Sequence, residues 1–176
     1  MKILHRSRKG GFTLIEMLVV IAIIAILTGI IITGLVGSKA KARDAKRASD
    51  LSQISLAVEQ FFDRCDVYPT SLNTGDRGPM TNGSYACPND ASGNPITLGN
   101  FISVIPIDPT NSGVYVYSYA TNSTYTDYVL HTTFEASNSV LAQSAPAPTS
   151  WSSGFTCTNS GTTQGATNLD YCVRPN

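Results

Sequence analysis

The sequence predicts an α+β fold in which one long N-terminal helix packs on a small antiparallel β-sheet domain. Three observations predict this fold. Residues 17–36 form a run of 20 residues without a charged side chain. The first proline is Pro69, so no proline interrupts a helix before that residue. Beyond residue 64, β-branched and aromatic residues alternate with Pro, Asn, Ser and Gly, a composition typical of short strands joined by turns.

The apolar run predicts a transmembrane helix. At about 1.5 Å per residue, a helix of this length spans roughly 30 Å, the thickness of the hydrocarbon core of a bilayer. A buried helix of a globular domain is the alternative, but the remaining chain is rich in Ser, Thr, Asn and Gly and offers little core to surround it. A removable secretory signal is disfavoured, because its apolar region normally has about 7–15 residues and ends at a small-residue cleavage site. The run is therefore expected to stay in the protein as the membrane-spanning first half of the long helix.

Positive charge is concentrated on both sides of this run. The chain has 12 Lys and Arg and 12 Asp and Glu residues, but three basic residues against ten acidic ones follow residue 47, which leaves about −7 there. This distribution counts against a nucleic-acid partner. The basic residues near the run are Lys2, Arg6, Arg8 and Lys9 before it, and Lys39, Lys41, Arg43, Lys46 and Arg47 after it. The second group is expected to anchor at anionic lipid head groups. Nucleic-acid binding and pairing with acidic residues of neighbouring copies are the alternatives.

A carboxylate lies near the start of the apolar region. Residues 9–16 read KGGFTLIE, so Glu16 is the fifth residue of an otherwise uncharged stretch that begins at Phe12. A charged side chain in hydrocarbon costs about 3 kcal/mol even on the lenient insertion scale, so such a residue is a functional hypothesis by default. A position at the membrane interface, with the side chain reaching water, is the alternative.

This arrangement resembles the class III signal of type IV pilins and pseudopilins, in which a basic leader, a glycine and a phenylalanine precede an aliphatic helix. The resemblance implies that a membrane-embedded prepilin peptidase cuts after Gly11 on the cytoplasmic side and methylates the new N-terminus at Phe12. It implies that Glu16 neutralises the α-ammonium of a neighbouring subunit during filament assembly. It also implies a cytoplasmic leader and an extracytoplasmic C-terminal domain.

The helix is expected to continue beyond the membrane, from about Phe12 to about Asp63. Apolar residues recur there at spacings of three and four, as on one face of a helix. They are Ala48, Leu51, Ile54, Val58 and Phe61. This stripe predicts that the second half of the helix packs on a globular domain.

The C-terminal part is predicted to contain strands at residues 101–107, 114–120 and 125–134. Three tyrosines in the middle segment occupy alternate positions, so their side chains share one face. They are Tyr115, Tyr117 and Tyr119. This face is expected to pack against the helix.

Two short stretches in this part strengthen the resemblance. Residues 68–70 and 105–109 look like the corresponding stretches of the major pseudopilins of type II secretion. Those proteins bind calcium in an Asp- and Gly-rich loop near the C-terminus. No such loop is recognisable here, because Asp127, Glu135 and Asp170 are scattered in the sequence, so neither a metal site nor another cofactor is predicted.

Four cysteines follow the apolar region: Cys65, Cys87, Cys157 and Cys172. An even number in an extracytoplasmic domain predicts two disulfides, for which three connectivities exist. Pairing of neighbours in the sequence, Cys65 with Cys87 and Cys157 with Cys172, is favoured. Zinc binding is the alternative, but close Cys-x-x-Cys or Cys-His spacing is lacking.

These features divide the chain into four parts. They are a leader peptide at residues 1–11, a transmembrane and assembly helix at 12–37, the amphipathic half of the same helix at 38–63, and an extracytoplasmic β-rich domain at 64–176. Disulfide-bonded loops are expected in the last part.

The predicted function is that of a structural subunit of a type IV pilus-like filament. Its expected partners are copies of itself, related pilins, the prepilin peptidase, a membrane assembly platform and the bilayer. It is expected in the bacterial cytoplasmic membrane with its N-terminus inside, and then in a cell-surface or envelope filament. A major-type pseudopilin of a type II secretion system is one alternative, and a non-assembling membrane-anchored binding module is an alternative of another class. An enzyme is not expected, because His131 is the one histidine beyond the apolar region and no nucleophile triad, P-loop or dinucleotide motif occurs.

Overall fold

The structure of the protein is a computed structural model that describes residues 11–137, 139–155, 157 and 169–175, without the side chains of residues 32–36. The chain divides into two compact units, Met1–Lys39 and Ala40–Asn176. Helix α1 (Leu14–Cys65) runs through both. Its bounds lie within two residues of the predicted ones.

Helix α1 begins and ends where local side chains satisfy or prevent its hydrogen bonds. At its start, Thr13 and Glu16 form a capping box in which each side chain accepts a backbone N–H of the other residue. At its end, Asp66 has a φ of +56°, a left-handed conformation that a helix cannot continue through. Pro69 follows shortly and lacks the N–H that another turn would need.

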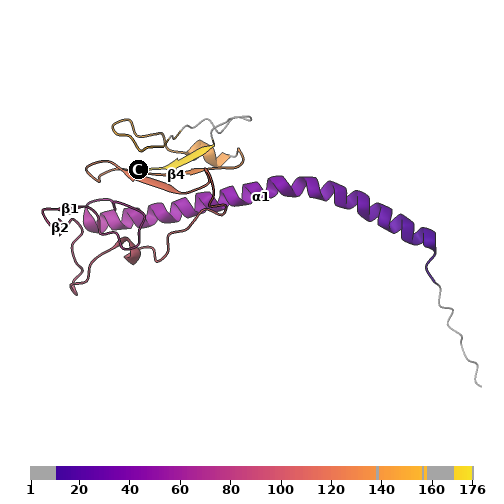
Figure 1. The fold of residues 1–176 in the computed structure, drawn as a ribbon, viewed down its shortest axis with the longest axis horizontal. Helices are drawn as coiled ribbons and strands as arrows, with labels where there is room; N and C mark the ends of the chain where they lie inside the picture. Colours follow the sequence, from indigo (N-terminus) through magenta and orange to yellow (C-terminus); the bar gives the residue numbers. More distant parts are fainter. Residues whose placement is uncertain (1–10, 138, 156, 158–168, 176) are drawn as a thin grey trace, which may run out of the picture. The chain divides into compact units, whose positions relative to one another are not determined.

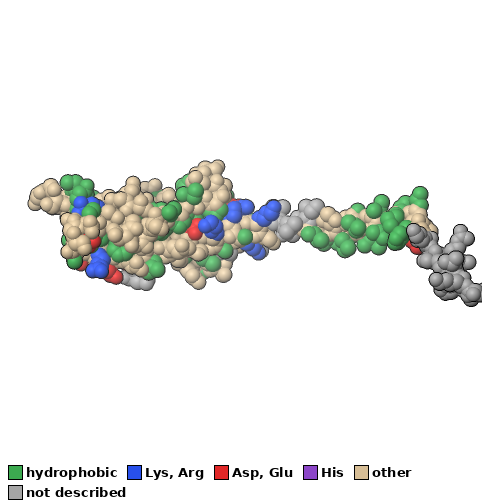
Figure 2. Space-filling model, turned by 90° about the horizontal axis from the view of Figure 1, so that it is seen from below, with side chains coloured by type: hydrophobic (Ala, Val, Ile, Leu, Met, Phe, Trp, Pro, Cys, Tyr) green, Lys and Arg blue, Asp and Glu red, His purple; other side chains and the backbone are tan. Residues whose placement is uncertain are grey.

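The segment Leu14–Ile31 of α1 is long and apolar enough to cross a membrane. Its mean hydropathy is 2.9, and none of it is buried within the chain. Figure 2 shows hydrophobic side chains covering this part of the helix. Because no other part of the described chain covers these side chains, lipid or another protein must shield them from water.

The second half of α1 forms the core of the unit Ala40–Asn176. Leu51, Ile54, Val58 and Phe61 are fully buried, as the predicted stripe requires, while Ala48 is partly buried. A three-stranded antiparallel sheet lies along this half of the helix (Figure 1). The α+β architecture is therefore the predicted one.

The sheet has the order β3-β4-β5. Strand β3 (Ser118–Thr121) pairs with β4 (Tyr128–Thr133), and β4 pairs with β5 (Asp170–Val173). Alternate residues of β4 face opposite sides, as the strand period demands. Tyr128 and Leu130 pack in the core with α1, whereas Val129 packs with the second disulfide on the other face.

Tyr115 and Tyr117 contact the helix, as predicted, whereas Tyr119 packs on the core and bonds to the turn that follows the helix. The Tyr117 hydroxyl donates to Asp50 of α1 at 2.8 Å, and the Tyr119 hydroxyl donates to the Pro69 carbonyl at 2.8 Å. The Tyr115 ring lies over the guanidinium of Arg47, 4.9 Å from its carbon.

The predicted strand at 101–107 is wrong. This segment follows a 3-10 helix (Leu98–Asn100) and is not part of a sheet. Pro106 and Pro109 cannot donate to a ladder, which disfavours strand pairing. The segment instead packs beside α1, where the Phe101 ring meets the Phe61 ring edge-on at 6.2 Å between centroids.

Three further elements were not predicted. The hairpin of β1 (Met80–Thr81) and β2 (Ser84–Tyr85) turns at Asn82-Gly83, where both residues have positive φ. This is the Asn-Gly signal of a two-residue hairpin. Strand β5 and a 3-10 helix at Ser139–Gln143 also escaped prediction.

Both disulfides join neighbouring cysteines in the sequence. Cys65, the last residue of α1, is bonded to Cys87, and Cys157 is bonded to Cys172 of β5. The first bond closes the loop that carries the β1–β2 hairpin, and the second ties the C-terminal region to the sheet.

Replacing Phe61 by alanine should destabilise the protein by about 3–5 kcal/mol, because a fully buried ring leaves a cavity in a packed core. The measurement is denaturant unfolding of the full chain in detergent micelles. Leu56→Ala on the exposed face of the same helix is the matched control and should change the free energy of unfolding by no more than about 0.5 kcal/mol. Equal losses in both variants would contradict the proposed core.

Candidate functional site

The predicted processing residues lie at the exposed start of α1. Phe12 is 80% exposed. A Cβ placed on Gly11 would meet no atom within 4 Å, so the described chain itself imposes no steric need for glycine at this position. Neither residue has a structural role in the described part of the chain, which leaves both available to an external enzyme.

Glu16 has a local structural role that the sequence analysis missed. One carboxylate oxygen accepts both the backbone N–H and the hydroxyl of Thr13, each at 2.7 Å. The Glu16 N–H in turn donates to the Thr13 hydroxyl at 3.3 Å. The signal was present in the sequence as Thr-x-x-Glu before an apolar run. Since glutamine also serves in a capping box, helix capping by itself does not require a charge at Glu16.

The surroundings of Glu16 are apolar. A shallow, open hollow with a volume of about 440 Å³ is lined by Phe12, Ile15, Glu16, Val19 and Val20. It contains one carboxylate among aliphatic and aromatic side chains. Such a surface suits a mostly apolar partner that carries one positive charge at a matching position.

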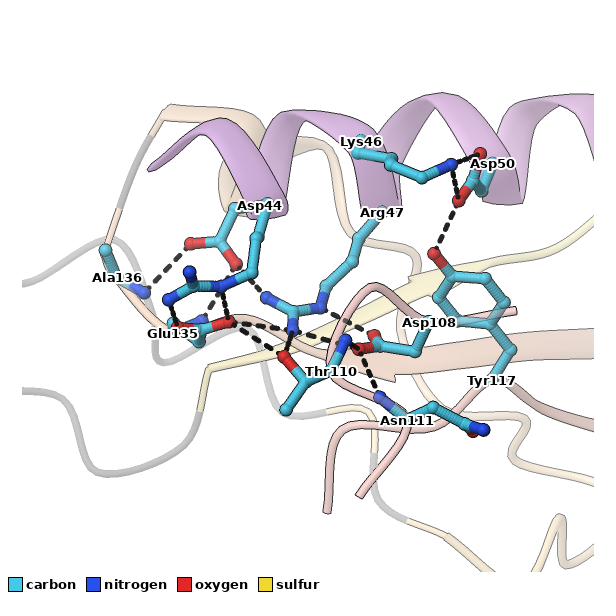
Figure 3. Close-up of polar contacts among 11 residues, drawn as sticks. Asp44, Lys46, Arg47, Asp50, Asp108, Thr110, Asn111, Tyr117, Glu135 and Ala136 are labelled. Carbon is cyan, nitrogen blue, oxygen red and sulfur yellow. Dashed lines mark hydrogen bonds and ion pairs between the residues drawn. The ribbon is translucent and has the colours of Figure 1, made fainter. Parts of the chain in front are cut away.

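A second polar site is buried in the unit Ala40–Asn176. Arg47 of α1 has no exposed surface and is the largest fully buried side chain among the described residues. Its guanidinium donates to Asp108 through Nε at 2.6 Å and through a terminal nitrogen at 3.1 Å. It also meets Asp44 at 2.7 Å and Glu135 at 2.8 Å (Figure 3). We call these four residues, together with Arg43, the Arg47 cluster.

The Arg47 cluster joins three separate segments. Arg43 adds a second guanidinium, which donates through Nε to Glu135 at 2.7 Å. Asp44 accepts the backbone N–H groups of Glu135 and Ala136, both at 2.9 Å. Helix α1 is thereby bound to the turn at 108–111 and to the chain that leaves β4. Removing one partner of a buried pair of this kind typically costs about 3–5 kcal/mol, because the other charge stays buried without compensation.

The contacts in this cluster favour the charged forms of Glu135, Asp108 and Arg47. Hydrogen bonds from Arg43, and also from Arg47, lower the pKa of Glu135 to about 2. Burial alone would raise the pKa of Asp108, but the hydrogen bond from Arg47 and those from two backbone N–H groups outweigh it and lower the value. Burial opposes the charge of Arg47 as well, yet its hydrogen bonds to Asp108, Glu135 and Asp44 raise its pKa further.

The basic group after the apolar run is thus divided between two environments. Arg43, which is partly exposed, and the buried Arg47 belong to the Arg47 cluster, and Lys46 pairs with Asp50 at 3.0 Å. Lys39, Lys41 and Lys46 are exposed, so the lipid-anchor prediction concerns these three side chains. The sequence analysis missed the role of Arg47, although it continues the buried stripe one turn before Leu51.

The three scattered acids of the C-terminal part each have a separate partner. Asp127 accepts from Arg174 at 2.6 Å, Glu135 belongs to the Arg47 cluster, and Asp170 meets His131 at 3.0 Å. Among the residues that the structure describes, no group of three His, Cys, Asp or Glu side chains is placed to hold a metal ion.

Acid should weaken the contribution of Glu135 to stability. Its pKa is about 2 in the folded protein, against an ordinary value of 4.5. The stabilisation is therefore complete above about pH 4.5 and is lost as the pH falls towards 2. Glu135→Gln should be less stable than the wild type at neutral pH, and the difference should shrink over this range in unfolding experiments on the full chain in micelles. A difference that stays constant from pH 6 to about pH 2 would contradict this pairing. Asp63→Asn, on the exposed side of α1, is the control for a surface carboxylate.

Comparison with known proteins gives one family match at the N-terminal end and several relatives. Residues 6–32 match the prokaryotic N-terminal methylation motif. The type II secretion system core protein G of Aeromonas hydrophila is 32% identical over 106 residues, which cover 60% of this chain and 71% of that protein. The core protein G of Vibrio cholerae is 34% identical over 64 residues, 36% of this chain and 44% of that protein. The type IV major pilin protein PilA of Myxococcus xanthus is 32% identical over 78 residues, 44% of this chain and 36% of that protein.

No solved structure matches the chain. Apart from the protein of A. hydrophila, the chain matches less than half the length of these relatives. The N-terminal motif, the apolar helix that continues into an α+β domain, and the similarity to the A. hydrophila protein agree with one another. The chain therefore belongs to the family of type IV pilins and type II secretion pseudopilins, whose members are structural proteins and not enzymes.

Proposed function

We propose that this protein is a major-type pseudopilin, a filament subunit of a type II secretion system. The observation that carries the proposal is the single carboxylate, Glu16, at the start of an apolar helix that the chain leaves uncovered. The similarity to core protein G of several type II secretion systems supports this choice over the pilus subunit that the sequence analysis placed first.

Proteolytic processing is the first step of the proposed function. The peptidase cuts between Gly11 and Phe12 and methylates the new α-amino group. Residues 1–11 are the cytoplasmic leader, residues 12–37 span the membrane and later the filament core, residues 38–63 are the amphipathic half of the helix, and residues 64–176 lie outside the membrane. The exposed position of Gly11 and Phe12, outside the helix, supports access by an enzyme.

During assembly, the contacts of the helix with lipid are replaced by contacts with other subunits. The exposed aliphatic side chains of Leu14–Ile31 pack against those of neighbouring copies in the filament. Glu16 meets the methylated α-ammonium of Phe12 of another copy, so that neither charge remains unpaired in an apolar core. An unpaired charge in hydrocarbon costs about 3 kcal/mol on the insertion scale. The pairing therefore favours one axial register between neighbouring helices.

A type IV pilus subunit is the second candidate. The similarity to the major pilin of M. xanthus favours it. The disulfide between Cys157 and Cys172 also resembles the C-terminal disulfide loop of many type IV pilins. Deletion of the gene separates the two functions, because a secretion subunit is required for release of exoproteins and a pilus subunit for surface pili.

The proposed pairing predicts that the charge of Glu16 is needed and not merely its hydrogen bonds. Glu16→Gln keeps a side chain able to cap the helix, yet it should abolish filaments while membrane insertion is retained. The measurement is electron microscopy of sheared filaments, with membrane fractionation as the insertion assay. Thr13→Val, which removes the hydroxyl but no charge, is the matched control and should retain filaments.

Normal assembly of Glu16→Gln would contradict a role for the charge. If neither variant forms filaments, the defect is attributed to loss of the helix cap. A non-assembling membrane-anchored module would tolerate all of these substitutions and keep its leader.

The cleavage site predicts the mass of the mature N-terminal peptide. In a membrane fraction that contains active prepilin peptidase, this peptide should begin at N-methylated Phe12. Gly11→Val should leave the chain uncleaved, because the backbone at the scissile bond must approach the active site closely. Gly10→Val, the same change one residue earlier, is the control and should permit cleavage. An intact Met1 start in the wild-type protein would contradict the proposal.

A further inference from the structure

The unit Ala40–Asn176 has an open pocket that the proposed function does not use. Its volume is about 630 Å³, which lies within the range of about 300–1,000 Å³ typical of small-ligand sites. Residues of the β1–β2 hairpin line one part of the pocket, and this hairpin lies beside the C-terminal end of α1 (Figure 1). Another part is lined by residues 123–125, in the turn between β3 and β4.

The lining of this pocket is uncharged and rich in hydroxyl groups. None of the lining residues is Asp, Glu, Lys, Arg or His. The lining residues that bear a hydroxyl are Thr70, Thr81, Tyr85, Ser123, Thr124 and Tyr125. Within the described part of the chain, four of these hydroxyls have no hydrogen-bond partner, those of Thr81, Tyr85, Ser123 and Tyr125. A hydroxyl both donates and accepts, so these groups are available to a ligand that carries hydroxyls itself.

Tyr85 adds an aromatic surface to the pocket. The residue is 43% exposed. Its ring is held by Arg77, whose guanidinium carbon lies 4.4 Å from the ring centroid and which also donates to the side-chain oxygen of Asn89 at 2.8 Å. A ring that is contacted on one face can still pack a ligand on its other face. The C–H groups of a sugar ring suit such a face, because the face of an aromatic ring carries partial negative charge.

Tyr125 is held at the pocket in a strained conformation. Its φ is +58°, a left-handed value that is an outlier for a bulky residue. The side-chain oxygen of Asn122 accepts the backbone N–H groups of Thr126 at 2.9 Å and of Asp127 at 3.3 Å. The carbonyl of Tyr125 accepts the N–H of Tyr68 at 2.8 Å. Strain of this kind, maintained by surrounding bonds, is concentrated at ligand sites in proteins.

The chemistry of the lining favours a neutral ligand rich in hydroxyls. A charged ligand would lose its hydration without meeting an opposite charge in the lining. An extended peptide binds through its main chain along the edge of a strand, but β1 and β2 have only two residues each. A saccharide presents hydroxyls around its ring and C–H groups on its faces, so it matches both the free hydroxyls and the tyrosine ring.

We propose that this pocket binds a neutral saccharide. The ring of Tyr85 packs against a face of the sugar, and the hydroxyls of Ser123 and Tyr125 exchange hydrogen bonds with sugar hydroxyls. The inference goes beyond the proposed function, because it assigns a ligand to the unit Ala40–Asn176 and requires no contact between subunits.

An array of neutral and acidic oligosaccharides tests this site. The full chain is displayed on phosphatidylcholine vesicles, which carry many copies of it and no sugar, and empty vesicles are the control. Binding should be confined to neutral oligosaccharides. It should not weaken when the salt concentration is raised, because no charge takes part.

Two substitutions locate the binding in the pocket, with the best neutral oligosaccharide of the array as the titrant. Tyr85→Ala should reduce the affinity by about tenfold or more, because the aromatic surface is lost. Tyr125→Phe should reduce it by roughly fivefold, the usual effect of one lost hydrogen bond. Tyr115→Phe removes a tyrosine hydroxyl outside the pocket and is the matched control, which should bind as the wild type does. Thermal unfolding of Tyr125→Phe should match the wild type, since its hydroxyl has no partner in the described chain.

Several results would overturn the inference. They are absence of binding to every neutral oligosaccharide, equal or stronger binding to acidic oligosaccharides, and equal binding to an uncharged peptide spotted on the same array. Unchanged affinity in Tyr85→Ala or in Tyr125→Phe, or an equal loss in Tyr115→Phe, would also overturn it, because the sugar would then bind elsewhere. Filament formation does not enter the test, so any of these results would leave the proposed function intact.

Discussion

Burial of Arg47 is the interaction on which the arrangement of the unit Ala40–Asn176 depends. A guanidinium inside a protein is stable only when each side of its fork is paired, and here Asp44, Asp108 and Glu135 supply those partners. Because these acids come from three different segments, one arginine holds the turn at 108–111 and the end of β4 on α1. Tyr117, which directly precedes β3, adds a hydrogen bond to Asp50 of the same helix.

This anchoring has a consequence for the surface of the molecule. Residues 104–114 are held on the core by Asp108, which is buried against Arg47, and by the partly buried Ile105, while Val104, Ile107 and Val114 are exposed. A loop held in this way loses little conformational entropy when it binds, which favours its use as a contact surface.

The two halves of helix α1 differ in the kind of surface that they present. In Leu14–Ile31 it is apolar on all sides and leaves its side chains to lipid or to other subunits. In the second half it buries one stripe and exposes the other side, as an amphipathic helix does. Glu16 is the exception in the first half, and its capping box with Thr13 holds the carboxylate at the very start of the helix, next to Phe12.

The sequence alone determined the helix, its apolar half, the processing motif and the stripe from Leu51 to Phe61. Each of these depends on residues close together in the chain, so length, hydropathy and helical spacing were sufficient to predict them. Tertiary structure decided the rest. The partners of Arg47 lie far away, with Asp108 61 residues distant, and no local pattern reveals such a pairing. The segment at 101–107 has the composition of a strand, yet Phe101 packs on Phe61 beside the helix, and Pro106 cannot donate to a sheet ladder. A small hollow lined by Leu56 and Phe101 forms where helix α1 meets this segment. A surface made by segments distant in the sequence cannot be recognised in either segment by itself.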